Sequence, residues 1–253
     1  MTDSIKEKEI ELLKEIREYT FNNKELLNAH HFMFACPVKR NGKPADIMIC
    51  GINPGGDPKG KDYRKIYKGR PFPTEESSDY DWWVQDNDKT RSANGADGRY
   101  LKCAYDVLGA QKNIILTEAF FWNSTSVSKK HFDERYGYSL DKNPHWDFCV
   151  KMNLELFKAH NPDLILVFKS NKAEVPKIAK RFNLNEIHSF ELDCGDRPPT
   201  KMYHYETDSS IPFIFVPHPS GYIWTSEMVK AIKEYLYNVT EITSKHKENV
   251  QIL

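Results

Sequence analysis

The sequence predicts an α/β fold, a three-layer αβα sandwich around a central sheet of four parallel strands. Two observations predict this fold: short apolar runs recur along the chain, and helical patterns separate them. The runs lie at 46–51, 113–117, 163–168 and 211–216. Each run is continuously apolar rather than alternating, which is typical of strands in a sheet that is covered on both faces.

Helical periodicity fills the segments around these strands. Asn143 and Pro144 are typical of a helix start, because Asn caps helices and Pro suits their first turn. Gly109 suits the left-handed residue that ends a helix. Helices are expected over 5–20, 99–108, 144–160, 171–182 and 225–240.

We expect a single domain over residues 1–253, with the helix over 5–20 as the one candidate for an appendage. Residues 244–253 are predicted to form a frayed polar tail. The segments predicted to be irregular are 53–98, 123–142 and 192–210. The first of them is long for a compact domain, and long loops of this kind are usually functional.

Charge and cysteine content exclude several classes of protein. The 36 Lys and Arg residues equal the 36 Asp and Glu residues, which argues against a long basic arm but not against a local basic groove. The N-terminus is charged where a secretory signal would be apolar, and no segment approaches the length of a membrane span. The cysteines, Cys36, Cys50, Cys103, Cys149 and Cys194, are odd in number and lack C-x-x-C spacing. We therefore expect a cytoplasmic monomer without a metal site.

Two strands run directly into turn motifs. Gly51-Ile-Asn-Pro-Gly-Gly56 follows the first strand, and Pro217-His-Pro-Ser-Gly221 follows the last. Open α/β sheets bind ligands at the carboxyl ends of their strands. The competing interpretation is that both motifs are simple turns. The two glycine-rich motifs that bind phosphate, G-x-x-x-x-G-K-[ST] and G-x-G-x-x-G, are both absent from the sequence.

As a pair, GINPG and HPSG resemble the two signature motifs of the uracil-DNA glycosylase superfamily. GINPG is similar to the motif of the mismatch-specific branch, while Asn in the first motif with HPS in the second resembles the single-strand-selective monofunctional branch. The resemblance spans 46–221, with identity limited to the motifs. It implies a fold of that superfamily and a monofunctional DNA N-glycosylase without a cofactor. Such an enzyme flips a pyrimidine (uracil or a modified cytosine-type base) out of double- or single-stranded DNA and leaves an abasic site.

The resemblance also assigns two catalytic residues. Breaking an N-glycosidic bond builds positive charge on the sugar and negative charge on the departing base. His218 would donate a hydrogen bond to the base O2, and Asn53 would orient the attacking water. The iron–sulfur branch of the superfamily is excluded by the cysteine spacing.

The base would be bound by residues near the first motif and the end of the second strand: Gly51, Ile52, Phe72, Glu118 and Asn123. Phe72 is the candidate for stacking on the base, with Tyr63, Tyr67 and Trp82 as alternatives and loop packing as the competing interpretation. Glu118 stands where relatives often carry Asn. An ionised carboxylate only accepts hydrogen bonds, so it suits the N4 amino group of cytosine and repels uracil O4. The alternative is that Glu118 points elsewhere and Asn123 reads the base.

The residues after the second motif would contact DNA. Tyr222, Ile223 and Trp224, preceded by Ser220 and Gly221, suit a wedge between base steps. Packing under the last helix is the competing interpretation. Phosphate contacts are assigned to Lys59 and Lys61, in a basic cluster with Arg64, Lys65 and Lys68 that also fits a solvated face.

Two other functions stay open. One is a catalytically silent nucleic-acid-binding module of the same fold. The other is a metabolite hydrolase with Ser220 as nucleophile and His204 or His145 as base, although a G-x-S-x-G elbow is absent. A last departure from relatives is Phe168-Lys169 at the end of the third strand, in place of the usual glycine, and we expect it to affect packing more than chemistry.

Overall fold

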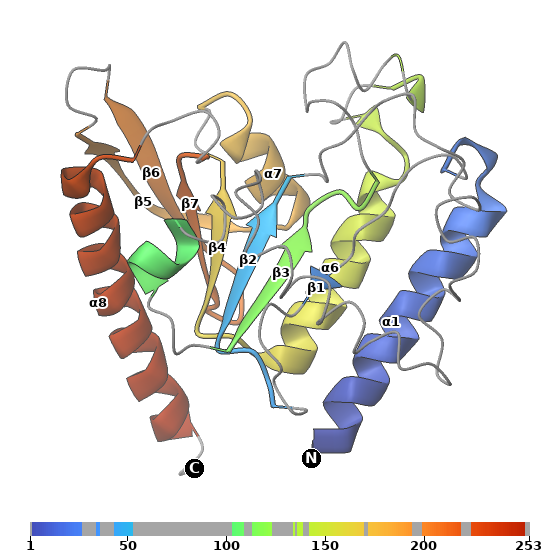
Figure 1. The fold of residues 1–253 in the computed structure, drawn as a ribbon, viewed down its shortest axis with the longest axis horizontal. Coiled ribbons are helices and arrows are strands. Elements are labelled where there is room, and N and C mark those ends of the chain that lie inside the picture. The colour runs from blue at the N-terminus through green and yellow to red at the C-terminus, as the bar shows by residue number, and fades with distance from the viewer. Residues whose placement is uncertain are drawn as a thin grey trace. The chain divides into compact units, whose positions relative to one another are not determined.

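The computed structural model describes residues 2–26, 34–35, 43–52, 103–108, 113–122, 134, 136–138, 142–169, 172–193, 199–218 and 224–250. The strands are β1 (Phe34–Ala35), β2 (Ile47–Gly51), β3 (Ile114–Glu118), β4 (Leu164–Phe168), β5 (Asn185–Leu192), β6 (Thr200–Glu206) and β7 (Pro212–Val216). The helices are α1 (Thr2–Asn22), the 3-10 helix η1 (Lys24–Leu26), α6 (Trp146–His160), α7 (Val175–Arg181) and α8 (Ser226–Val250). Residues 103–108 are also helical. The protein is thus a mixed α/β structure (Figure 1).

The strands predicted from the apolar runs are confirmed as β2, β3, β4 and β7. β4 pairs in parallel with β2 on one side and with β7 on the other. β3 also runs parallel to β2, because the bonded positions advance together: Asp46 N–H donates to Asn113 O, and Ala119 N–H donates to Gly51 O. Every residue of β2, β4 and β7 is buried. The continuous apolar runs therefore reflect strands with both faces covered.

The sheet is larger than the four strands that the sequence predicts. In the described part of the chain its order is β1-β3-β2-β4-β7-β6-β5. β1 is antiparallel to β3, β6 to β7, and β5 to β6. The prediction of irregular structure over 192–210 is therefore wrong. The pattern was missed because β5 is mostly exposed and polar, as in Glu186 and His188, so it lacks an apolar run.

The predicted helices occur with changed ends. Asn143 Oδ1 accepts a hydrogen bond from His145 N–H at 2.9 Å, so the predicted cap opens α6, which ends at His160 as expected. α1 is confirmed, and α7 is shorter than predicted. The prediction of a frayed tail is wrong for 244–250, which continue α8 because no Gly or Pro interrupts the helix after Ser226. Residues 251–253 and Gly109 lie outside the described residues.

The chain divides into two compact units, each made of separate stretches. The first comprises 1–44, 51–87 and 115–160, and includes α1, α6 and most of β3. The second comprises 45–50, 88–114 and 161–253, and includes β4 to β7, α7 and α8. A single domain stays a prediction.

Helix α1 is an integral part of the first unit. Leu12 and Ile16 are fully buried. Glu9 in α1 pairs with His160 in α6 at 3.1 Å, and both side chains are almost completely buried. Removing one partner of such a pair would leave a buried polar group without compensation. The interface between α1 and α6 is therefore part of the buried core of this unit.

Candidate functional site

Glu118, at the end of β3, lies against the first residue of the Gly51 motif. A β-carbon added at Gly51 would stand 2.6 Å from Glu118 Cδ and 2.7 Å from Oε1. Ordinary contacts between carbon atoms are about 3.5–4.0 Å. The Glu118 carboxylate therefore occupies the space that a side chain at position 51 would need. The side chain thus lies against the first residue of the first motif, and its role in reading the base stays a prediction.

The backbone around Glu118 is fixed from two sides. Phe120 N–H donates to Ile52 O at 2.8 Å, so the pairing of the two segments continues past the strands. On the other side, Asn153 in α6 accepts a hydrogen bond from Thr117 Oγ1 at 2.8 Å and donates to Glu118 O at 2.9 Å. Asn153 is fully buried, and its bond with Thr117 is buried as well, whereas the bond to Glu118 O is partly buried.

Asn153 was not singled out in the sequence. Its signal is a polar residue on the apolar stripe of a helix, between Cys149 and Phe157, which are both buried. Such a residue needs a hydrogen-bond partner inside the protein. The sequence does not reveal which strand supplies that partner.

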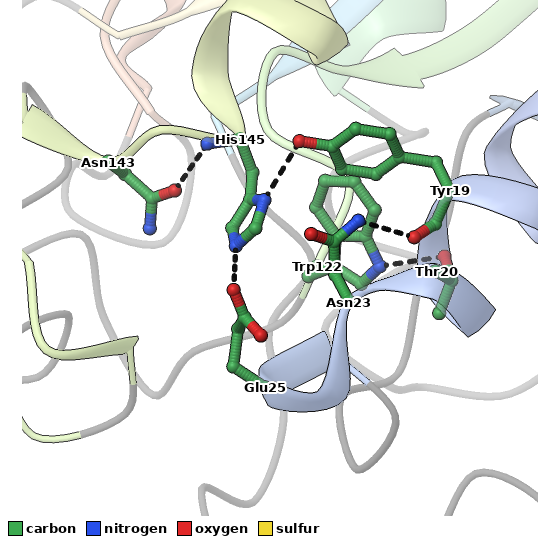
Figure 2. A network of polar contacts seen from close by, with 7 residues as sticks. All are labelled: Tyr19, Thr20, Asn23, Glu25, Trp122, Asn143 and His145. Carbon is green, nitrogen blue, oxygen red and sulfur yellow. Dashed lines mark hydrogen bonds and ion pairs between the residues drawn. The ribbon is translucent and has the colours of Figure 1, made fainter.

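A polar network braces Trp122, the residue just before Asn123 (Figure 2). Trp122 is fully buried, and its indole N–H donates to Thr20 Oγ1 at 3.2 Å. Beside it, Tyr19 OH lies 3.0 Å from His145 Nδ1, and His145 Nε2 lies 3.1 Å from Glu25 Oε1. The network thus joins α1 and η1 to the start of α6 and to the segment after β3.

The protonation of His145 follows from these partners. A carboxylate only accepts, so Nε2 carries the proton toward Glu25, and Nδ1 accepts from the Tyr19 hydroxyl. Burial lowers the pKa of His145, although Glu25 opposes the change. The ring is therefore neutral near pH 7 and all three side chains are satisfied. His145 therefore has hydrogen-bond partners within the fold on both ring nitrogens.

His218 follows β7 and lies among aromatic side chains of the second unit. Its ring and the Phe168 ring form a T-shaped pair, with 6.2 Å between centroids and a 72° interplanar angle. Trp224 also contacts Phe168, at 5.8 Å, and its indole N–H donates to Pro217 O at 3.2 Å. Burial lowers the pKa of His218, and the positive charge of Lys169 lowers it further. The imidazole is therefore neutral near pH 7.

The catalytic candidates of the two motifs lie at equal distances in sequence from one row of paired strand residues. Cys50, Val167 and Phe215 form one row across β2, β4 and β7. Asn53 comes three residues after Cys50, and His218 comes three residues after Phe215. Because β2, β4 and β7 are parallel, their carboxyl ends lie on the same side of the sheet.

Of the predicted site residues, the structure describes Gly51, Ile52, Glu118, His218 and Trp224. It brings Gly51 together with Glu118, and it brings His218 and Trp224 together around Phe168. The wedge role of Trp224 stays a prediction. The remaining candidates, Asn53, Phe72, Asn123, Ser220, Gly221, Tyr222, Ile223, Lys59, Lys61, Tyr63, Tyr67, Trp82, Arg64, Lys65 and Lys68, lie outside the described residues.

The second histidine considered for a hydrolase, His204, also has partners. Its Nδ1 lies 2.8 Å from Tyr235 OH in α8, and its Nε2 lies 3.4 Å from Glu206 Oε1. The first contact joins β6 to α8, and the second lies within β6. Like His145, it is engaged within the fold.

The described residues lack two kinds of feature. None of their helices has the length and apolar character needed to cross a membrane. Nor do three or more His, Cys, Asp or Glu side chains of these residues gather where they could hold a metal ion.

Comparison with known proteins adds no family assignment. No model of a protein family matches the chain, and no curated protein matches it. The function is therefore inferred from the residues and their geometry.

Proposed function

We propose that the protein is a monofunctional DNA glycosylase that flips a pyrimidine out of DNA and hydrolyses its N-glycosidic bond. The observation that carries the proposal is the common offset of Asn53 and His218 from the row Cys50–Val167–Phe215. The outer members of that row stand two strand spacings apart, about 10 Å. Ligands of open α/β sheets bind at this edge.

The chemistry assigns one role to each residue. Water attacks C1′ while the bond between C1′ and the base nitrogen breaks, and the bonding electrons leave with the base. His218 donates its ring N–H to O2 of the departing anion. The Asn53 side-chain oxygen accepts a hydrogen bond from the water and orients it. The released proton ends on the base, so the products are a free base and an abasic sugar.

A neutral His218 suits this reaction. The sugar becomes positive in the transition state, and an imidazolium close to it would oppose that charge. Burial and Lys169 lower the pKa of His218, which supports the neutral form at pH 7. A neutral ring still keeps one N–H to donate.

From Glu118 we infer that the enzyme prefers a cytosine-type base, which carries an exocyclic amino group, over uracil. Its carboxylate accepts the hydrogen bonds that an amino group donates. Support comes from its position against Gly51, at the start of the motif that contains Asn53. Asn123 is the alternative reader of the base. The proposal includes the three-layer αβα sandwich of the uracil-DNA glycosylase type, a DNA partner and a cytoplasmic monomer.

The test is excision from labelled oligonucleotides that contain uracil, mismatches or modified cytosines, read as strand cleavage at abasic sites by alkali. Wild type is compared with Asn53→Ala, His218→Ala and, as a matched control, His188→Ala on the exposed edge of the sheet. We expect excision in wild type and the control, and loss in both site variants. Binding of oligonucleotides without excision of any base would replace the proposal with the silent binding module.

A further inference from the structure

Asn153 is a fully buried amide in the middle of α6, and both its oxygen and its nitrogen bind the end of β3. Thr117 Oγ1 donates to Asn153 Oδ1 at 2.8 Å, and Asn153 Nδ2 donates to Glu118 O at 2.9 Å. Burying an amide costs free energy, and these two bonds offset the cost. They tie the end of β3 to a helix that is itself held by buried side chains such as Met152 and Leu156.

The peptide unit between Glu118 and Ala119 is held at both of its polar ends. Its carbonyl accepts a hydrogen bond from Asn153, and its N–H donates to Gly51 O at 3.0 Å. Because a peptide unit is planar, bonds at its two opposite ends fix the orientation of the whole plane. The helix and the first motif together therefore set the rotation about the Cα–C bond of Glu118.

The Glu118 side chain starts next to this plane and lies over Gly51. A β-carbon at Gly51 would stand 2.7 Å from Glu118 Oε1, and the other carboxylate oxygen, Oε2, is buried. The rotamers open to a side chain depend on the dihedral angles of its own backbone. The held peptide unit thus keeps the carboxylate against the start of the first motif.

We propose that Asn153 is a positioning residue that sets base preference by holding the Glu118 carboxylate against the first motif. The inference rests on the proposed function, because Asn153 acts through the carboxylate assigned to the amino group of a cytosine-type base. A displacement of about 1 Å in a site costs up to about 100-fold in rate. Uracil lacks the amino group, so its excision depends less on where the carboxylate lies. Loss of the Asn153 amide should therefore lower the preference for the amino-bearing base over uracil.

The experiment measures this preference as a ratio of two single-turnover excision rates. The substrates are oligonucleotides that carry either an amino-bearing modified cytosine or uracil at the same position. Asn153→Leu removes both bonds, whereas Asn153→Asp keeps the size and the acceptor for Thr117 but offers Glu118 O no N–H when ionised. We expect the ratio to fall by up to about 100-fold in both variants. A lower folded fraction does not change the ratio, because both rates scale with it.

His160→Leu is the matched control, since it removes a buried pair with Glu9 at the end of the same helix. It should lower the free energy of unfolding and leave the ratio unchanged. In a Glu118→Ala background, Asn153→Leu should not change the ratio further, because no carboxylate is left to position. A wild-type ratio in both Asn153 variants, or an equal fall in His160→Leu, would overturn the inference.

A second measurement needs no DNA. Amide hydrogen exchange of Ala119, followed by NMR in the full chain, reports the hold on the peptide unit itself. Exchange should be faster in Asn153→Leu and Asn153→Asp than in His160→Leu, and equal rates in all three would also overturn the inference. Failure of the proposed function is seen separately, as the absence of excision in wild type, and the role in base preference would then fall with it.

Discussion

The contact between Gly51 and Glu118 allows a perturbation that separates function from stability. In Gly51→Ala, the new β-carbon would stand 2.6 Å from Glu118 Cδ, against an ordinary contact of about 3.5 Å. The carboxylate must therefore retreat by about 1 Å. It is the end of a flexible side chain, so the retreat costs little. Replacing a glycine inside a strand with alanine also raises the free energy of unfolding by about 0.5–1 kcal/mol.

The expected result is a protein that folds normally but reads the base poorly. A displacement of about 1 Å in a site costs up to about 100-fold in rate. We expect this loss for an amino-bearing base and a smaller one for uracil, because uracil lacks the group that Glu118 would bind. The free energy of unfolding should stay within about 1 kcal/mol of wild type.

A double-mutant cycle identifies the cause. Glu118→Ala should lower excision of the amino-bearing base, and Gly51→Ala should have no further effect in that background, because no carboxylate is left to displace. The assays are urea denaturation and single-turnover excision on paired oligonucleotides. Equal losses from Gly51→Ala with and without Glu118 would refute the reasoning. Unchanged base preference in both single variants would refute the role of Glu118.

Three further predictions concern stability, measured by urea denaturation. Thr20→Val leaves the buried Trp122 N–H without its acceptor and should cost about 1–3 kcal/mol. Thr240→Val is the matched control, since that hydroxyl bonds only within its own helix, and its change should stay within about 0.5 kcal/mol. Asn153→Leu removes both hydrogen bonds at the end of β3 and should lower the free energy of unfolding by about 2–4 kcal/mol. An unchanged midpoint of urea unfolding would show that these two bonds do not stabilise the protein. Burial lowers the pKa of His204 from 6.5 to about 4, so the unfolded chain takes up this proton first as the pH falls. Stability should be full above about pH 6.5 and should fall by up to about 3 kcal/mol toward pH 4, and His204→Gln should remove that part of the loss.

The parallel strands were predictable because burial on both faces leaves a direct mark on the sequence. β2, β4 and β7 are buried at every position, and each appears as an apolar run. β5 leaves no such mark, because most of its side chains face water and its pairing with β6 is made by the backbone. β6 is largely buried, but with polar atoms in its Tyr and His side chains, so its composition did not distinguish it from a loop.

The sequence predicted the site only where residues that are adjacent in the chain form it. The motifs placed Gly51 and His218 at strand ends, because a motif and its strand are adjacent in sequence. The carboxylate of Glu118 reaches Gly51 through the pairing of two strands, which the sequence does not specify. Phe168-Lys169 was expected to affect packing, and the contact of the Phe168 ring with His218 was not predicted, because His218 follows a strand that comes much later in the chain.

The central claim is that Asn53 and His218 excise a base from DNA. Its most direct test is the single-turnover rate of excision for wild type, Asn53→Ala and His218→Ala on the best substrate from the oligonucleotide panel. Loss of one donor to a developing anion costs about 10²–10³-fold, and we predict a loss of that order for His218→Ala. Asn53→Ala should also be strongly impaired, with folding unchanged in both. Wild-type rates in both variants, or a wild type that excises no base, would contradict the account.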